Sequence, residues 1–382
     1  MNSQRRDPIE GGTGGAPLRA QEHGRGAEPH IGVPGFRISR SQRMHRWVLF
    51  ISIALVIGLA SVPFWSTVAV CRTLVTLFTL MALAQMWNLL GGYAGLISVG
   101  QQAYIGLGAY GLWLISDVIG LNPFVSVILA GGLAVLVALP VAPLIFRLRG
   151  GYFAIGTWVV AEVVRLIVAN IQATGGGSGK TIVSVAKLPI TSRIPGTYWL
   201  ALFVAVGSIL LVYLLLRSRN GLALTAIRDN DLAAQSSGVN VFRTKLYVYL
   251  LAAFGCGVVG AVVAMNLLRI QPAAAFSINW TAYAIFIVVI GGFGTIEGPI
   301  IGSVIYFALL QTLSQYGTTY MLLLGVIAVV VVARAPRGIW GYVVKRWDIH
   351  LFPVRRGLVL DVPEDAAPQA RAGEAGPAPE AG

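Results

Sequence analysis

Long apolar runs alternate with short polar connections from Trp47 to about residue 335. A helix that spans a bilayer needs about 20 apolar residues, and most of these runs supply them. The eighth and ninth runs are short and could form one broken hairpin, which would reduce ten spans to nine. The pattern predicts an all-α polytopic membrane protein with about ten transmembrane helices. The runs lie at about 47–65, 68–90, 101–119, 123–146, 151–171, 198–216, 246–268, 279–293, 298–314 and 319–335.

Composition supports this class. Of the 382 residues 56% are hydrophobic and 11% charged, whereas about a quarter of a soluble domain is charged. Of the 43 Asp, Glu, Lys and Arg residues, 24 lie in residues 1–46 and 336–382. This contrast excludes soluble globular, collagenous and disulfide-rich classes. We expect a disordered basic tail at 1–46, a transmembrane domain at 47–335 and a polar tail at 336–382, disordered and acidic beyond Gly357.

The distribution of Lys and Arg among the connections predicts an orientation. One side carries 13 of them, in loops after the fourth, sixth and last runs, against four on the other side. The positive-inside rule therefore places both termini in the cytoplasm. The net charge of +13 reports this orientation rather than nucleic-acid binding. Two connections are long enough to have a function besides joining helices, namely the external 172–197 and the cytoplasmic 217–245.

Other residue types argue against chemistry inside the bundle. All four histidines lie in the tails or at the membrane edge, and Cys71 and Cys256 are typical of small core residues. The Gly-rich segment 175–181 resembles a phosphate loop, but Thr174 stands where the first Gly is needed. We expect no catalytic residue, no metal and no cofactor bound by this chain.

Two Gly-rich interruptions occur inside apolar runs, at Gly91–Gly95 and Gly291–Thr295. Non-helical backbone at membrane depth lies against protein or water, and broken segments in two halves of a chain indicate a translocation path. The alternative is close helix packing through small residues. The candidates for the pathway or its gate are Gly91, Gly92, Tyr93, Ser98, Gln101, Glu162, Arg165, Gly291, Gly292 and Glu297.

Glu162 and Arg165 are spaced three residues apart, so they share a helical face and partly neutralise each other. Charges inside a bilayer are costly and need a reason. The pair is either a structural ion pair that holds helices in register or a pair that lines or gates a pore.

The connection 217–245 predicts two short helices joined by an acidic turn. Asn230 or Asp231 suits the start of the second helix, and Gly238 suits its end. The alternative is an ordinary polar loop. Against it, four apolar residues require an apolar partner, which a soluble subunit would supply: Leu222, Leu224, Ile227 and Leu232.

Five blocks in order over roughly 85–335 resemble the integral-membrane permease of ABC importers for branched-chain amino acids. These are Trp87–Tyr110, Arg149–Thr157 with the Glu–Arg pair, Thr174–Gly176, 226–240, and Gly291–Thr295 with Gly298 and Pro299. The Tyr152-Phe153-Ala154 block resembles the M-type rather than the H-type partner.

The resemblance implies a heteromeric importer in a bacterial inner membrane. Its parts are two unlike permeases, two cytoplasmic ATPases that use ATP and Mg, and a periplasmic substrate-binding protein. The loop resembles the EAA-type coupling motif, although Leu232 replaces the acidic residue, and Gln101 and Gln102 stand where many members show His. The implied coupling residues are Ala226, Ile227, Arg228, Asp231, Ala233, Ala234 and Gly238.

Three alternatives stay open at this point. Permeases for urea and short amides resemble this chain closely. A stand-alone secondary transporter is disfavoured because one Glu–Arg pair offers little machinery for coupling to ions. A membrane enzyme is less favoured still, because no cluster of His, Cys or acidic residues lies in the apolar region.

Overall fold

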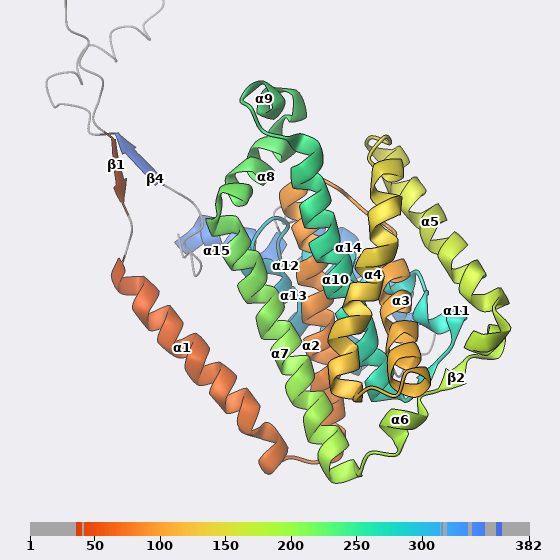
Figure 1. Cartoon of the computed structure of the whole chain (residues 1–382). Coiled ribbons are helices and arrows are strands. Elements are labelled where there is room, and N and C mark those ends of the chain that lie inside the picture. Colours follow the sequence, from red (N-terminus) through yellow and green to blue (C-terminus); the bar gives the residue numbers. More distant parts are fainter. Residues whose placement is uncertain are drawn as a thin grey trace, which may run out of the picture. The chain divides into compact units, whose positions relative to one another are not determined.

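The computed structural model describes residues 36–39, 42–313, 315, 319–334, 338–347 and 357–360, and most of them are helical (Figure 1). The longer helices are α1 (Gln42–Ser61), α2 (Val68–Asn88), α3 (Gln101–Trp113), α4 (Pro123–Ile145), α5 (Gly151–Asn170), α7 (Ile190–Arg217), α8 (Arg219–Asp229), α10 (Val241–Leu267), α12 (Asn279–Gly291), α13 (Glu297–Leu313), α14 (Thr319–Arg334) and α15 (Gly338–Trp347).

The remaining elements are short. They are α6 (Val183–Ala186), α9 (Asp231–Ser236), α11 (Pro272–Ala275), the π-helical turns η2 (Leu89–Tyr93) and η3 (Leu114–Val118), the 3-10 turns η1 (Val62–Phe64), η4 (Gln172–Thr174) and η5 (Gly176–Ser178), and the strands β1 (Phe36–Ser39), β2 (Lys180–Thr181), β3 (Arg269–Ile270) and β4 (Gly357–Leu360).

Each of the ten predicted apolar runs is occupied by a helix. An all-α membrane protein is therefore confirmed. Among the described residues six helical segments are long and apolar enough to cross a membrane, fewer than the ten spans predicted. These six are Val68–Tyr93, Pro123–Ile145, Gly151–Asn170, Ile190–Arg217, Val241–Leu267 and Pro272–Gly291. Shorter apolar helices cover Phe50–Phe64, Glu297–Leu313 and Leu322–Val331.

Helices α3 and α10 form the centre of the bundle, with α4 packed against both. Twelve consecutive residues of α3, Gln101–Leu112, are buried. The contact is close because glycines face backbone: a Cβ on Gly108 would lie 1.8 Å from the carbonyl oxygen of Gly257. A Cβ on Gly260 would lie 1.9 Å from that of Ile105. At these positions glycine serves helix packing, which is the role small residues have between membrane helices.

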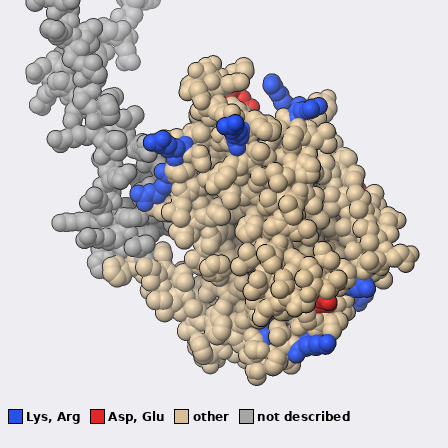
Figure 2. Space-filling view, in the orientation of Figure 1, with Lys and Arg blue, Asp and Glu red and all other residues tan. Residues whose placement is uncertain are grey.

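The bundle has two polar ends. The α6 end carries α6, β2 and the first turns of α2 and α7, and the α8 end carries α8, α9 and the last turns of α2 and α7 (Figure 1). Lys, Arg, Asp and Glu gather at these two ends on the face shown in Figure 2, with an uncharged belt between them. Such a belt suits the hydrocarbon layer of a membrane.

The connection after α5 is folded against the α6 end rather than extended. The carboxylate of Asp117 accepts hydrogen bonds from the backbone N–H groups of Val183 (2.7 Å) and Ser184 (2.9 Å). Strand β2 pairs with β3 in an antiparallel ladder, Lys180 opposite Ile270. The connection 172–197, which the sequence predicts to be external, is thus fixed by the hydrogen bonds of Asp117 and by the pairing of β2 with β3.

Residues 36–39 and 357–360 form a compact unit of their own, in which β1 and β4 pair antiparallel from Phe36 opposite Leu360 to Ser39 opposite Gly357. The sequence predicted disorder in both regions, and for these strands that expectation is corrected. The apolar residues of β1 alternate with polar ones, the period of a strand. The predicted carboxyl-terminal tail also contains α15. The other tail residues lie outside the described part of the chain.

Candidate functional site

The first Gly-rich break lies at the α8 end, where α2 continues into η2 and the chain then turns back. The N–H of Leu96 donates to the carbonyl oxygen of Leu90 (3.0 Å). The indole N–H of Trp87 donates to that of Ser98 (2.9 Å). Residues 94–100 therefore run back along the last turn of α2. Gly95, with φ +69°, lies in the turn, a conformation that favours glycine.

The second break joins α12 to α13 in a tight hairpin. Gly292 and Gly294 have φ values of +144° and +70°. The hydroxyl of Thr295 donates to the carbonyl oxygen of Gly292 (3.0 Å) and accepts from the N–H of Gly298 (3.1 Å). The start of α15 rests on this turn, because a Cβ on Gly338 would lie 2.5 Å from the Cα of Gly292.

The two breaks meet through Asn88, which is completely buried. Its side-chain oxygen accepts from the N–H of Gly294 (3.0 Å), and its NH2 group donates to the carbonyl oxygen of Thr295 (2.8 Å). One turn earlier, Gln85 donates to the carbonyl oxygen of Ile296 (2.8 Å). A Cβ on Gly92 would lie 2.8 Å from the N atom of Gly294, so the approach requires glycine. Side chains at the end of α2, next to the first break, therefore hold the backbone of the second break.

Helices α8 and α9 form a knob at the same end, as the sequence predicted. Asn230 is the cap: its side-chain oxygen accepts from the N–H groups of Leu232 (2.9 Å) and Ala233 (3.1 Å). Gly238, with φ +83°, lies beyond the end of α9. Asp231 forms an ion pair with Lys245 at 2.6 Å, which ties the knob to the first turns of α10.

Arg228 connects the knob to the first break. Its Nη1 donates to the carbonyl oxygen of Gly92 at 3.2 Å, and its Nε lies 3.3 Å from the carboxylate of Asp229. The same Nη1 lies 3.4 Å from the place of a Cβ on Gly294. The guanidinium therefore lies beside both breaks.

The apolar residues of the knob divide into two groups. Leu224 (0% exposed) and Ile227 (3%) are buried within this chain, so the prediction that they need a second subunit is wrong for them. The reason is that α8 packs against α7 and α10. Leu222 (51% exposed) and Leu232 (71%) are left open. Of the small residues predicted to couple, Ala226, Ala233 and Gly238 are exposed, and Ala234 is buried.

Five further predicted residues lie buried near the breaks or in the bundle. Tyr93 is in η2 and Glu297 is the first residue of α13, where a helix amino terminus favours negative charge. Ser98 accepts from the N–H of Gly100 (3.2 Å). The side-chain oxygen of Gln101 accepts from Cys256 (3.3 Å), and both cysteines are buried and free. Gly291 packs on α13, since its Cβ would lie 1.9 Å from the carbonyl oxygen of Gly298.

Glu162 and Arg165 are bonded to each other on α5. The Nε of Arg165 lies 3.0 and 2.9 Å from the two carboxylate oxygens, and its Nη2 bonds one of them as well. The side chains are 45% and 29% exposed, respectively. In the described part of the chain no hydrogen bond or ion pair joins them to another helix. The pair is therefore an ion pair within α5 at a partly exposed position, and its role as a structural or a gating pair stays a prediction.

Sequence reasoning did not select Gln85, Asn88 or Thr295 as site residues, and it did not predict the contact between Gly338 and Gly292. Gln85 and Asn88 do carry a signal, since each places an amide in an otherwise apolar run. A buried amide needs hydrogen-bond partners, and exposed backbone in a helix break supplies them.

Comparison with known proteins finds relatives among transport permeases. The LivM permease protein of the high-affinity branched-chain amino acid transport system of Escherichia coli is 27% identical over 66% of this chain. A probable LivM of Methanocaldococcus jannaschii is 24% identical over 58% of the chain and 69% of its own length. The ribose import permease protein RbsC of Haemophilus influenzae is 27% identical over 45% of the chain and 59% of its own length.

The match spans 65% of the length of the Escherichia coli LivM. No solved structure matches the chain significantly. The LivM relatives agree with the M-type resemblance in the sequence. The family model described as the permease component of branched-chain amino acid transport systems matches residues 68–332. The chain therefore belongs to the family of permease components of branched-chain amino acid transport systems.

Proposed function

We propose that this chain is the M-type permease subunit of an ATP-driven importer, and that it forms part of the translocation pathway for leucine, isoleucine and valine. It crosses a bacterial inner membrane ten times, with both termini and the α8 end in the cytoplasm. The excess of Lys and Arg in the connections at that end supports this orientation. The family membership supports the transport role.

One contact carries the mechanism: the hydrogen bond from Arg228 to the carbonyl oxygen of Gly92. Movement of an ATPase docked on the knob would reach the first break through this bond. It would reach the second break through Asn88, which holds Gly294 and Thr295. Coupling between distant sites travels through packed contacts of this kind when the element they bias has two arrangements. The Gly-rich breaks are that element.

Each proposed partner is assigned to an exposed face of the subunit. Of the two ATPases, which bind ATP and Mg, one docks on the exposed side of this subunit's knob, formed by Leu222, Ala226, Leu232 and Ala233. A second, unlike permease covers the outer face of α5 with its Glu162–Arg165 pair. A substrate-binding protein delivers the solute at the α6 end. This subunit holds no cofactor, no metal and no catalytic residue of its own.

The identity of the proposed solute is supported by family membership alone. Similarity to a ribose import permease over 45% of the chain shows that related permeases serve another solute class. Urea and short amides are a further candidate class. An uptake panel of leucine, isoleucine, valine, urea, acetamide and ribose therefore separates these possibilities.

The test is reconstitution with and without partners. The complete complex should take up leucine only with ATP inside and binding protein outside. The subunit alone should neither hydrolyse ATP nor take up solute along a proton or sodium gradient. Gradient-driven uptake by the purified subunit would replace the importer by a secondary transporter. Uptake of another solute by the complete complex would revise the substrate and keep the mechanism.

A further inference from the structure

A groove lies between α7 and α10 at the α8 end, where the two helices are in contact (Figure 1). Its volume is about 510 Å³. Binding sites for small molecules have volumes of roughly 300–1,000 Å³. The groove opens toward the outside of the bundle, since Leu210 and Leu214 in its wall are 51% and 56% exposed. At the level of membrane-spanning helices, such an opening faces the lipid.

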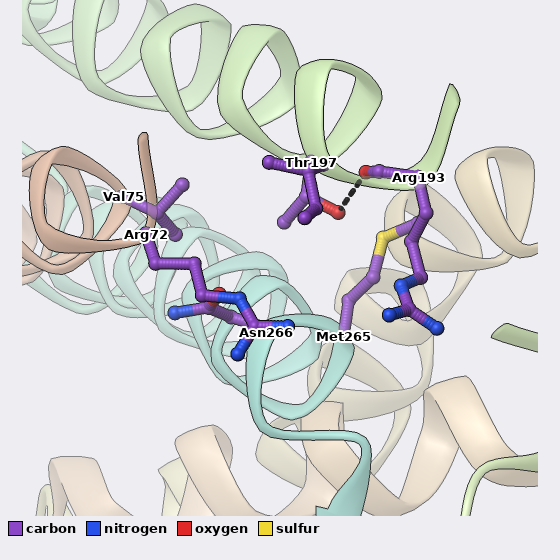
Figure 3. A pocket seen from close by; sticks show the side chains of 7 residues that line it. Arg72, Val75, Arg193, Thr197, Met265 and Asn266 are labelled. Atoms are coloured by element: carbon purple, nitrogen blue, oxygen red, sulfur yellow. Dashed lines mark hydrogen bonds between the residues drawn. The ribbon is translucent and has the colours of Figure 1, made fainter. Parts of the chain in front are cut away.

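A second pocket, at the α6 end, is far smaller. Arg72 and Arg193 line it on either side of Met265 (Figure 3). Its volume of about 10 Å³ has room for one water molecule. Of these two hollows, only the groove can hold an organic ligand.

The groove has the length of one leaflet of a bilayer. On α7 it extends from Gly207 to Ser218, and a helical rise of about 1.5 Å per residue makes this span about 16 Å long. The hydrocarbon core of a bilayer is about 30 Å thick, so one leaflet takes about 15 Å. Most of the wall is leucine, but the Ser218 end is polar and includes Asn220 and Tyr247. Tyrosine is enriched at the membrane–water boundary. One acyl chain of a phospholipid therefore fits, with its headgroup at the polar end.

The polar end carries cations that have no acidic partner. Arg217 follows Leu214 by three residues, so the two share a face of α7. Arg243 precedes Tyr247 by four residues on α10 and shares a face with it in the same way. Both arginines are exposed, and among the described residues neither forms an ion pair. The guanidinium of Arg217 donates to the hydroxyl of Tyr213 (2.9 Å). Figure 2 shows Lys and Arg gathered at this end of the molecule. The headgroup that fits is therefore anionic.

The same charges argue against a helix of this chain as the occupant. Helix α1 is the candidate, because its last turn is bonded to α7: the hydroxyl of Tyr198 donates to the carbonyl oxygen of Leu59 (2.7 Å). The sequence of its amino end, however, contains Arg43 and Arg46. These charges would meet the basic end of the groove, so an anionic lipid is favoured over α1.

We propose that the groove binds one anionic phospholipid, with an acyl chain along the leucines and the phosphate beside Arg217 and Arg243. Lipid tails are as apolar as leucine, so the wall accommodates a chain without selecting it, and the arginines supply the selectivity. Each contributes about a fivefold preference for an anionic headgroup. Since α7 leads into α8 and α10 follows α9, the lipid lies at the base of the knob. Such a site depends on the membrane location of the chain and not on the transported solute.

The test measures lipid binding to the full-length chain in detergent by native mass spectrometry, with phosphatidylglycerol and phosphatidylethanolamine added in equal amounts. The wild type should bind one phosphatidylglycerol in preference. Arg217→Gln and Arg243→Gln should each raise its Kd by about fivefold, and the double variant should raise it further. Lys187→Gln removes an exposed cation at the α6 end and should leave this Kd unchanged.

A second variant fills the groove itself. No atom lies within 4 Å of a Cβ on Gly207, so Gly207→Phe has room to place its ring in the groove. This change should abolish binding of the lipid while the chain stays folded. Gly132→Phe in α4, whose Cβ position is equally open, is the matched control and should bind lipid as the wild type does.

The outcomes distinguish the possible occupants. Unchanged binding by Gly207→Phe and by the double arginine variant overturns the site, and equal Kd values for the two lipids overturn its assignment to an anionic headgroup. Lipid that is bound by the isolated chain and lost in the complex with a second permease assigns the groove to that subunit. A disulfide that forms readily between cysteines placed at Phe50 and Leu210 assigns it to α1. If Gly207→Phe lowers the yield, the arginine variants decide, because both side chains are exposed.

Discussion

The guanidinium of Arg228 donates a hydrogen bond to the carbonyl oxygen of Gly92, 3.2 Å away. The two residues belong to different parts of the fold: Arg228 lies in the last turn of α8, the first helix of the knob, and Gly92 lies in the π-helical turn that follows α2. Since Gly294 of the second break lies beside the same guanidinium, one side chain touches the three segments proposed to move together.

Arg228→Gln should uncouple the transporter without preventing its assembly. A hydrogen bond from a charged group contributes about 1.5–3 kcal/mol when fully formed, and less here because the side chain is 38% exposed. We expect substrate-stimulated ATP hydrolysis and uptake to fall by on the order of tenfold, with ATPase pull-down unchanged. Arg219→Gln, on the same helix and exposed, is the matched control. Equal losses in both variants would show a general charge effect instead.

Asn88→Ala should lower stability more than its volume suggests. The change leaves the N–H of Gly294 and the carbonyl oxygen of Thr295 without the partners they have now. Each buried unpaired group costs about 1–3 kcal/mol. Thermal unfolding of the detergent-solubilised subunit should shift down clearly, whereas Asn170→Ala at the exposed end of α5 should shift it little. A silent Asn88→Ala would mean that water replaces the amide and that the breaks are not joined there.

The sequence predicts the positions of the helices better than the contacts between them. Apolar runs locate ten helices, and Asn230 and Gly238 locate the ends of α9, because these signals are local. The junction of Asn88 with Gly294 joins residues 206 positions apart, and nothing local encodes it. The inner face of each helix is hidden as well, because helices that are apolar all round carry no amphipathic stripe.

Gly108→Ala should prevent correct packing of α3 on α10. The new Cβ would lie 1.8 Å from a backbone oxygen of Gly257, which cannot rotate away as a side chain can. Overpacking typically costs about 1–3 kcal/mol, and a clash with backbone belongs at or above the upper end. Gly132→Ala in α4 is the control, because no atom lies within 4 Å of its Cβ position. Size-exclusion profiles of the two variants should differ sharply, and similar profiles would contradict the packing described.

Neutralising Glu162 or Arg165 should have different effects in the isolated subunit and in the complex. A partly exposed pair contributes under about 1 kcal/mol, so Glu162→Gln and Arg165→Met should each leave thermal unfolding of the subunit nearly unchanged. If a second permease covers α5, each single change leaves a buried charge unpaired. Uptake by the complex should then fall more in either single variant than in the double variant. Two single variants with full uptake would show that no subunit buries this pair.

The knob offers two adjacent alanines that separate docking from folding. Ala233 is exposed, whereas Ala234 is 2% exposed and its carbonyl oxygen accepts from the N–H of Val239 (3.1 Å). Ala233→Arg should block ATPase pull-down and substrate-stimulated hydrolysis while membrane abundance stays at the wild-type level. Ala234→Arg places a charge inside the knob and should lower abundance itself.

Crosslinking in the assembled complex tests which side of the membrane the α8 end faces. A cysteine introduced at the exposed Asn230 should crosslink to an ATPase and never to the binding protein. Asn230 caps α9, so Asn230→Ser, which keeps a capping oxygen, checks that the site tolerates change. Crosslinks to the binding protein would place the α8 end outside the cell. That result would remove both the coupling role of Arg228 and the delivery of solute at the α6 end, because each depends on the same orientation.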